Sequence, residues 1–310
     1  MRIVFMGTPE FAANILYELR EQHDVVAVYT RPDAVRGRGR KLVPSPVREV
    51  AESFGIPVYT PKTLRNPAEI ERLAEIAPDA ICVAAYGMIL PQEVLDIPDY
   101  GCLNVHGSLL PKYRGAAPIE RAILDGEAET GVCIMRMEAG LDTGPYCISR
   151  SCEIGSMPFA KLVGELADLG ACALLSALFA IENGGVHWIE QNDEDASYAE
   201  KIGKHELDLR PEDPAALNAR RVQASSDAHS SRCIIAGKTV TVLMASNAEC
   251  DASAECGAVV FSKKKLYLRC TDGFIEITTV KPDGKKEMPA AAFAAGIQGI
   301  KSNTLTWESL

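Results

Sequence analysis

The sequence predicts an α/β domain followed by a smaller β-rich domain. Over the first 187 residues, short apolar stretches alternate with longer stretches of helical periodicity, an order typical of an open, mostly parallel, Rossmann-like sheet. Between residues 239 and 280, short strand-like stretches follow one another with turn signals between them, as in a small β-barrel. A chain of 310 residues is also long enough for two domains. We expect the first domain over residues 1–187, a linker over 188–206 and the second domain over 207–310.

The expected elements of the first domain alternate in order along the chain. Strands are predicted at residues 2–6, 25–29, 58–59, 80–84, 102–105, 131–137 and 145–153, and helices at 11–22, 46–54, 67–77, 92–97, 118–125 and 158–183. Thr8 and Pro9 have the residue types of an N-cap and a first helical position, and Ser45 with Pro46 repeats that start. Gly55 is placed to end the second helix. The strand at 131–137 alternates in side-chain type, so we expect it to be half-exposed.

Several classes of protein are disfavoured by composition and motifs. The turn Gly7-Thr8-Pro9-Glu10 follows the first strand but lacks G-x-G-x-x-G, so a nicotinamide or flavin enzyme is not expected. We see no signal-peptide pattern and no apolar run of membrane-span length, and we expect a cytoplasmic protein without a membrane partner. The ten cysteines form no C-x-x-C pair, and Cys82, Cys102, Cys133 and Cys172 lie in apolar runs, which predicts reduced, buried thiols.

Charge is distributed unevenly along the chain. The net charge is −10, and residues 1–200 hold 17 Lys and Arg against 29 Asp and Glu, whereas residues 201–310 hold 15 against 13. An acidic protein does not bind nucleic acid indiscriminately. Any polyanionic partner must therefore be bound by local basic patches.

A polar pair ends the strand expected at residues 102–105. Asn104 and His106 are two residues apart, so their side chains leave the strand on one face, at the end where ligands bind in open α/β sheets. An amide and an imidazole can stabilise an oxyanion, and a carboxylate such as Asp142 can orient the imidazole and favour its charged form. This set suggests acyl transfer. Spacing alone equally permits a capping Asn, a hydrogen-bonded core His and a turn Asp.

The residues around this pair resemble a known family. Asn104–Pro111, followed by Arg114–Ile119, resembles the signature of the 10-formyltetrahydrofolate-dependent formyltransferases, and Met137 with Gly140–Gly144 resembles that family's second motif. The resemblance covers residues 1 to about 206 and resumes near residue 272. It implies a Rossmann-like catalytic domain, an OB-like second domain, and 10-formyltetrahydrofolate as cosubstrate without a metal.

The resemblance also implies roles for individual residues. Asn104 and protonated His106 would stabilise the oxyanion, and Asp142 would keep His106 charged. The residues expected to bind the folate are Tyr86, Ile89, Leu90, Ser108, Leu109, Leu110 and Pro111. Tyr86 could equally be a core residue.

A basic loop separates the second strand from the second helix. Four of its cations, Arg36, Arg38, Arg40 and Lys41, are interspersed with glycines, and the loop leaves the strand end that lies on the same rim as His106. The alternative is a solvated charge run. In the family, a basic loop here enters the acceptor arm of tRNA, so the implied acceptor is methionyl-initiator tRNA. A nucleotide-linked amino sugar or glycinamide ribonucleotide is the alternative acceptor, and a non-enzymatic RNA-binding module would not need the three polar residues.

The second domain carries both a match to the family and a departure from it. Lys281–Met288 matches the final motif, and its lysines, with Lys263–Lys265, either follow a phosphate backbone or flank a solvated hairpin. The family's asparagine-proline-tryptophan-proline stretch is absent from Arg220–Arg232, which affects how this domain would dock tRNA. We expect a monomer.

Overall fold

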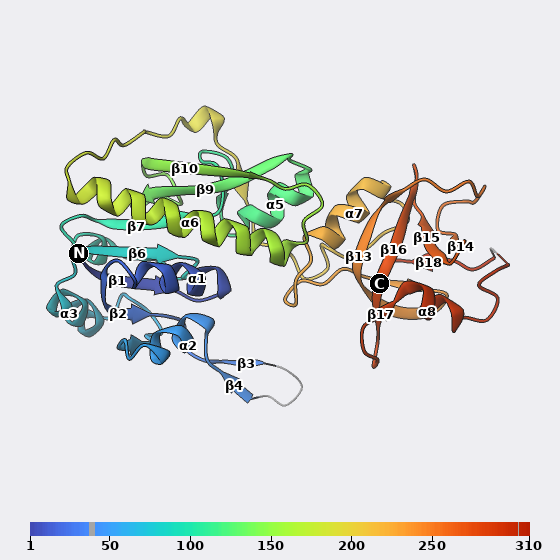
Figure 1. Ribbon diagram of the computed structural model, residues 1–310, viewed down its shortest axis with the longest axis horizontal. Helices are drawn as coiled ribbons and strands as arrows, with labels where there is room; N and C mark the ends of the chain where they lie inside the picture. The colour runs from blue at the N-terminus through green and yellow to red at the C-terminus, as the bar shows by residue number, and fades with distance from the viewer. Residues whose placement is uncertain (37–40, 303) are drawn as a thin grey trace. The chain divides into compact units, whose positions relative to one another are not determined.

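The computed structural model describes residues 1–36, 41–302 and 304–310, and it forms two compact units (Figure 1). The first unit comprises Met1–Pro118, Glu129–Glu153 and Leu162–Ala199, and the second comprises Ile119–Ala128, Ile154–Lys161 and Glu200–Leu310. Two short stretches, 119–128 and 154–161, therefore belong to the same unit as residues 200–310.

The first unit is built on one twisted sheet of seven strands. Their order is β10 (Tyr146–Glu153), β9 (Glu129–Arg136), β7 (Cys102–His106), β6 (Ala80–Ala84), β1 (Arg2–Gly7), β2 (Asp24–Tyr29) and β5 (Val58–Tyr59). Neighbours from β7 to β5 are parallel, whereas β9 and β10 are antiparallel additions at one edge. The predicted parallel-dominated α/β fold is confirmed. Because β1 lies between β6 and β2, the chain order reverses there, and the carboxyl ends of β1, β6 and β7 form the edge where ligands bind.

The helices of this unit begin and end close to their predicted positions. They are α1 (Glu10–Leu19), α2 (Pro46–Ser53), α3 (Pro67–Ile76), α4 (Gln92–Leu95) and α6 (Phe159–Glu182), while α5 (Pro118–Asp125) belongs almost entirely to the second unit (Figure 1). Ser45 caps α2 as predicted, because its Oγ accepts the N–H of Arg48 at 3.1 Å. In α6, a Cβ on Gly170 would lie 2.8 Å from a methyl carbon of Val105, so this glycine lets the helix pack closely on β7.

Several local predictions are wrong. Thr8 does not cap α1: Pro9 is the N-cap residue, and Thr8 Oγ1 donates instead to the carbonyl of Tyr86 at 3.1 Å, because a tertiary partner is available across the sheet edge. Strand β9 is buried from residue 130 to residue 135 rather than half-exposed. One of its faces packs under Leu110 and the other lies inside the unit. Cys172 is exposed on α6, although all ten cysteines are free thiols as expected.

Helix α6 is more apolar than we expected of any segment of this chain. By length and composition it is the one helix in the described part of the chain that could cross a membrane, so the prediction that no such run exists is wrong. Half of its most apolar window is buried against the rest of the protein, as in the core helix of a globular domain.

The second unit is an antiparallel sheet that nearly closes into a barrel. Its strand order is β14 (Val259–Ser262), β15 (Lys265–Arg269), β16 (Phe274–Pro282), β13 (Lys238–Ala248), β12 (Arg232–Ile235) and β18 (Trp307–Glu308), with β17 (Met288–Pro289) beside β16. The two ends meet because the N–H of Val259 donates to the carbonyl of Leu305 at 2.8 Å and that of Trp307 to Gly257 at 2.7 Å. The expected barrel is confirmed. Strands β12, β17 and β18 and helices α7 (Ala215–Gln223) and α8 (Ala290–Ala295) are additional to the prediction.

Candidate active site

The glycine that ends β1 lets three segments meet at the carboxyl edge of the sheet. A Cβ on Gly7 would lie 2.6 Å from the Cβ of Ala12 and 2.9 Å from the carbonyl oxygen of Ala84. Helix α1 can therefore approach the ends of β1 and β6 only if residue 7 has no side chain. The ends of β6 and β7, which carry the predicted site residues, lie at the same edge.

His106 ends β7, and each of its ring nitrogens faces an acceptor oxygen. The side chain is 5% exposed, and Nε2 lies 2.9 Å from the carbonyl oxygen of Tyr113. Because a carbonyl only accepts hydrogen bonds, Nε2 carries the proton of this bond. Nδ1 lies 3.8 Å from Oδ2 of Asp142, within ion-pair distance. The predicted approach of Asp142 to His106 is therefore present, and the ring is oriented from both sides.

Asn104 lies two residues earlier in β7, and its side chain is half-buried. Among the residues that the structure describes, no group hydrogen-bonds to its amide. An amide placed at a strand's carboxyl end without an internal partner is free to bind a ligand.

Asp142 occupies a strained turn between β9 and β10. Its φ is +53°, and its Oδ2 accepts the N–H of Gly115 at 2.9 Å. At the end of the same turn, a Cβ on Gly144 would lie 2.0 Å from the carbonyl oxygen of Arg136, so only glycine fits there. The Gly140–Gly144 motif is thus required to bring the carboxylate beside His106 and Gly115.

The loop after β7 presents backbone more than side chains. Ser108 is fully buried and donates from Oγ to the carbonyl of Lys112 at 2.6 Å, while Leu110 is 5% exposed and donates its N–H to Sγ of Cys133 at 3.3 Å. Leu109 and Pro111 are half-buried, and the Leu110–Pro111 peptide bond is cis. Of the predicted folate-binding residues in this loop, Leu109 and Pro111 have partly accessible side chains, whereas those of Ser108 and Leu110 are buried.

The loop after β6 also contains both buried and exposed residues among those predicted to bind the folate. Tyr86 is 2% exposed and Leu90 is 6% exposed, and both belong to the hydrophobic core beneath the edge of the sheet. Ile89 is 75% exposed. The side chain of Tyr86 is therefore a core residue, as the alternative reading allowed, and burial raises the pKa of its phenol well above the usual value.

The basic loop begins beside the same edge. Strands β3 (Ala34–Arg36) and β4 (Lys41–Val43) pair as an antiparallel hairpin in which Arg36 lies opposite Lys41. Arg38 and Arg40 lie outside the described residues. The acid of this region, Asp33, is paired with Arg48 of α2 at 3.0 Å, so it does not neutralise the hairpin.

Three residues of the site were not predicted from the sequence. Gln191, expected to be exposed in a linker, donates from Nε2 to the carbonyls of Asp142 at 2.9 Å and Gly144 at 2.7 Å. Its Oε1 accepts from Nε of Arg114, which is 1% exposed. Ser197 accepts the N–H of Tyr113 at 2.9 Å. The sequence signal near them was that Arg114 opens the family-like stretch Arg114–Ile119, which pointed to no contact with Gln191 or Ser197.

Comparison with known proteins identifies the family. The profile described as "Formyl transferase" matches residues 1–170, and "Formyl transferase, C-terminal domain" matches residues 201–298. Methionyl-tRNA formyltransferase from Xylella fastidiosa strain 9a5c is 44% identical over 297 residues, covering 94% of this chain and 96% of the relative. That of Cereibacter sphaeroides strain KD131 is 41% identical over 308 residues, covering 98% of this chain and 100% of the relative.

A solved structure shares the fold at lower identity. HypX from Aquifex aeolicus, in complex with tetrahydrofolic acid, has a TM-score of 0.66 and 20% identity, covering 97% of this chain and 48% of that one. Two matching domain profiles and near-complete coverage by relatives above 40% identity agree with the site geometry. The chain belongs to the formyl transferase family, among the methionyl-tRNA formyltransferases.

Proposed function

We propose that the protein transfers the formyl group of 10-formyltetrahydrofolate to the α-amine of methionyl-initiator tRNA, in support of translation initiation. The observation that carries this proposal is the presence, at the carboxyl edge of a formyl transferase sheet, of His106 beside Asp142 and of the Asn104 amide, which has no hydrogen-bond partner among the described residues. We assign formyl transfer to residues 1–187, a linker to 188–206 and tRNA binding to 207–310. We further propose that the protein acts as a monomer in the cytoplasm.

The residues at this edge are suited to a reduced folate. The exposed side chain of Ile89 and the partly exposed Leu109 and Pro111 offer apolar surface for a pterin ring. The amide of Asn104, without a described partner inside the protein, offers a donor. When bound, the folate supplies a formyl carbon attached to nitrogen.

The chemistry needs stabilisation of charge and movement of one proton. The neutral methionyl amine attacks the formyl carbon, the bond from that carbon to the folate nitrogen breaks, the amine loses a proton and the folate nitrogen gains one. Asn104 Nδ2 and His106 Nδ1 donate hydrogen bonds to the formyl oxygen as negative charge develops on it. Asp142, 3.8 Å from Nδ1, balances the charge of the imidazolium and can take up the amine proton through a water molecule.

Recognition of tRNA is assigned to two basic surfaces. One is the basic loop that contains Arg36, Arg38, Arg40 and Lys41; the described strands at its two ends, β3 and β4, follow β2, which ends at the ligand-binding edge of the first unit. The other is on the second unit, where Lys281, Lys285 and Lys286 are exposed. Lysine–phosphate contacts of this kind make affinity fall as salt rises.

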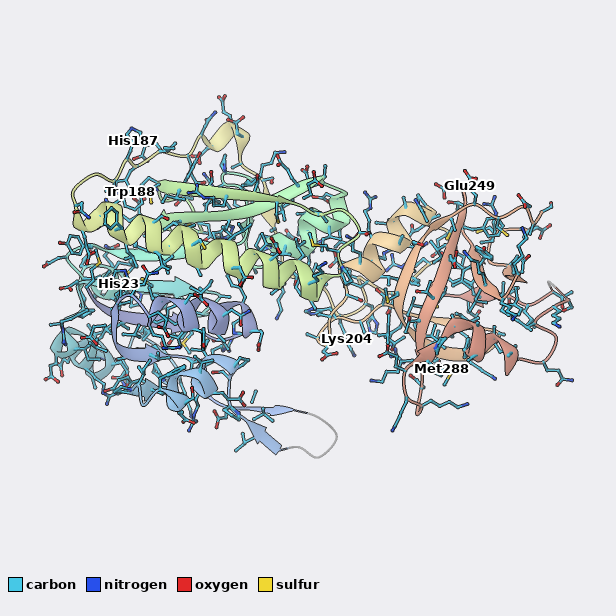
Figure 2. The ribbon with its side chains drawn as sticks, viewed as in Figure 1. His23, His187, Trp188, Lys204, Glu249 and Met288 are labelled. Carbon is cyan, nitrogen blue, oxygen red and sulfur yellow. The ribbon has the colours of Figure 1, made fainter. Side chains whose placement is uncertain are left out.

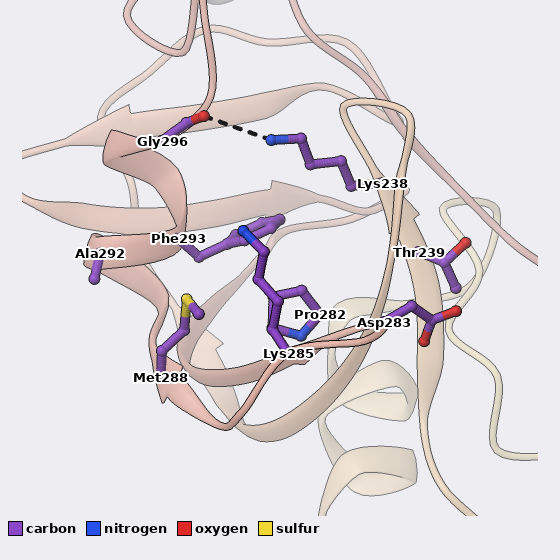
Figure 3. A pocket seen from close by; sticks show the side chains of 9 residues that line it. All are labelled: Lys238, Thr239, Pro282, Asp283, Lys285, Met288, Ala292, Phe293 and Gly296. Carbon is purple, nitrogen blue, oxygen red and sulfur yellow. Dashed lines mark hydrogen bonds between the residues drawn. The ribbon is translucent and has the colours of Figure 1, made fainter.

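A hollow lies beside the second surface. It measures about 370 Å³, and its lining is mixed: Lys238, Lys285 and Asp283 contribute charge, and Phe293 and Met288 contribute apolar surface (Figure 3). Lys265, by contrast, forms an ion pair with Glu276 at 2.8 Å. Its charge is partly neutralised, so it contributes less to phosphate binding than the run Lys263–Lys265 suggests from the sequence.

The proposal is tested by a formylation assay with 10-formyltetrahydrofolate and three acceptors: methionyl-initiator tRNA, free methionine and an amino-sugar nucleotide. We expect product on the charged tRNA alone, with a rate that falls at high salt and with Arg38→Ala. Arg65→Ala, which alters an exposed arginine elsewhere on the first unit, is the matched control and should keep the wild-type rate. Product on the sugar nucleotide would instead support the alternative acceptor and overturn the roles of both basic surfaces.

A further inference from the structure

The segment from Gln191 to Ala199 forms a clasp over the two loops that carry the proposed catalytic groups. It starts from an anchored position: Ile189 and Tyr146 exchange backbone hydrogen bonds of 2.8 and 3.0 Å, and the guanidinium of Arg136 lies 4.4 Å from the ring centroid of Trp188 (Figure 2). The clasp is therefore attached to β10 before it reaches the site.

Gln191 holds the turn that contains Asp142. Its amide nitrogen donates to the carbonyls of Asp142 and Gly144, and its oxygen accepts from Nε of Arg114. Carbonyls only accept and guanidinium only donates, so these three contacts permit one orientation of the amide. Two hydrogen bonds from one side chain thus hold a residue whose backbone is in the left-handed region.

Burial keeps the guanidinium of Arg114 in contact with Gln191. Its side chain is 1% exposed, with Nη1 2.9 Å from Oδ1 of Asp193, and its Nη2 has no partner among the described residues. A buried guanidinium with few partners cannot turn elsewhere at low cost. The acceptor oxygen of Gln191 is therefore required where it lies.

Ser197 holds the loop that orients His106. Tyr113 has a φ of +60°, and its N–H donates to Oγ of Ser197 at 2.9 Å, while the N–H of Arg114 donates to the Ser197 carbonyl at 2.8 Å. Strand β11 (Tyr198–Ala199) then pairs in parallel with β8 (Arg114–Gly115). The Tyr113 carbonyl that accepts the Nε2 proton of His106 is thereby fixed in direction.

We propose that Gln191 and Ser197 are positioning residues for formyl transfer: Ser197 fixes His106 with its proton on Nε2 and Nδ1 toward the reaction, and Gln191 fixes the carboxylate of Asp142 beside Nδ1. This inference rests on the proposed function of His106 and Asp142. It gives the clasp a catalytic consequence beyond holding the chain together.

The direct test is the protonation pattern of His106, read by long-range proton–nitrogen NMR spectra of protein labelled with ¹⁵N-histidine. The chain has five histidines, and His106→Gln identifies the signal of interest. In the wild-type protein at a pH where the ring is neutral, we expect the pattern with the proton on Nε2. In Ser197→Ala we expect a mixture of both neutral forms, and in Ser197→Thr, which keeps the hydroxyl, the wild-type pattern.

Kinetics provide the second measurement. Gln191→Glu keeps the oxygen that Arg114 needs but loses both donors to the carbonyls, so kcat should fall about ten- to hundredfold, the scale expected for a misplaced catalytic group, with little change in KM for the folate. The pH–rate profile of Gln191→Glu should also shift, since the distance from Asp142 to His106 changes. Asn192→Ala is the matched control, because among the described residues the side-chain hydrogen bonds of Asn192 go to Glu194 and Asp195 within the clasp.

These outcomes separate the two proposals. An unchanged His106 pattern in folded Ser197→Ala, or an unchanged kcat and pH profile in folded Gln191→Glu, would overturn the positioning role. If one of these variants does not fold, the other decides. If the wild-type protein formylates no charged tRNA, the proposed function fails, and the NMR comparison still tests the clasp by itself.

Discussion

Replacing Asn104 by alanine tests the oxyanion role with little effect on the fold. The side chain is half-buried and has no hydrogen-bond partner among the described residues, so its removal leaves no described group unsatisfied. The backbone of β7 keeps its pairing with β6 and β9. We therefore expect a change in stability below about 1 kcal/mol, as for other substitutions outside a core or network.

The expected catalytic loss is much larger. A donor that acts only on developing charge contributes about 3 kcal/mol, which corresponds to roughly two orders of magnitude in kcat. Single-turnover formylation at saturating substrates measures this loss, with folate Kd by fluorescence titration and Tm measured alongside. Asn104→Asp has nearly the same shape but no donor, and it should lose at least as much.

The reasoning would be refuted by either of two results. A loss of folate affinity with kcat unchanged would mean that Asn104 binds ground state and transition state alike. A near-normal kcat in Asn104→Asp would mean that no donor is needed at that position.

Three further predictions concern local structure. Gly115 has a φ of +121°, and a Cβ there would lie 2.8 Å from the carbonyl oxygen of Ala199, so Gly115→Ala should lower stability by about 1–3 kcal/mol in urea unfolding; an unchanged midpoint would contradict it. Ser45→Ala removes both the N-cap of α2 and the hydrogen-bond partner of the buried Thr30 hydroxyl, so it should cost about 1–2 kcal/mol, whereas Ser45→Thr keeps a capping hydroxyl; an unchanged midpoint in Ser45→Ala would contradict this. Burial tends to raise the pKa of Glu206, but hydrogen bonds from Arg121 and a backbone N–H outweigh it and lower that pKa. The stabilisation is therefore present above the unfolded pKa and is lost as the pH falls through the folded pKa, so Glu206→Gln should be less stable at pH 7 by about 0.5 kcal/mol, given solvent screening, and equal to wild type at low pH. A deficit that persists at low pH would show that the ion pair is not its source.

Much of the fold follows from local patterns. The helical stretch at 158–183 became α6 (Phe159–Glu182), and Ser45 capped α2, because periodicity and capping are properties of a few neighbouring residues. The short strands expected between residues 239 and 280 were found for the same reason. Strands β17 and β18 were missed because each is two residues long, and so short a stretch carries little alternation signal.

Failures occurred where a distant partner changed a local preference. Thr8 had a capping residue type, but the carbonyl of Tyr86 was available to it across the sheet edge. Strand β9 alternated like a half-exposed strand, yet Ile134 is buried because the first unit covers both faces at that point. Propensity is a weak prior that tertiary packing overrides.

The sequence by itself determined the types of chemical group and their family context: an amide and an imidazole on one strand face, and a carboxylate in a glycine-flanked turn. Side-chain alternation and motif identity are written in adjacent residues, so they can be read without a structure. Only the tertiary structure decided how those groups are oriented. His106 is fixed by the carbonyl of Tyr113, and Asp142 is held by Gln191, 49 positions along the chain. Hydrogen bonds between residues so far apart leave no local pattern, because their geometry exists only after the sheet and the clasp have packed together.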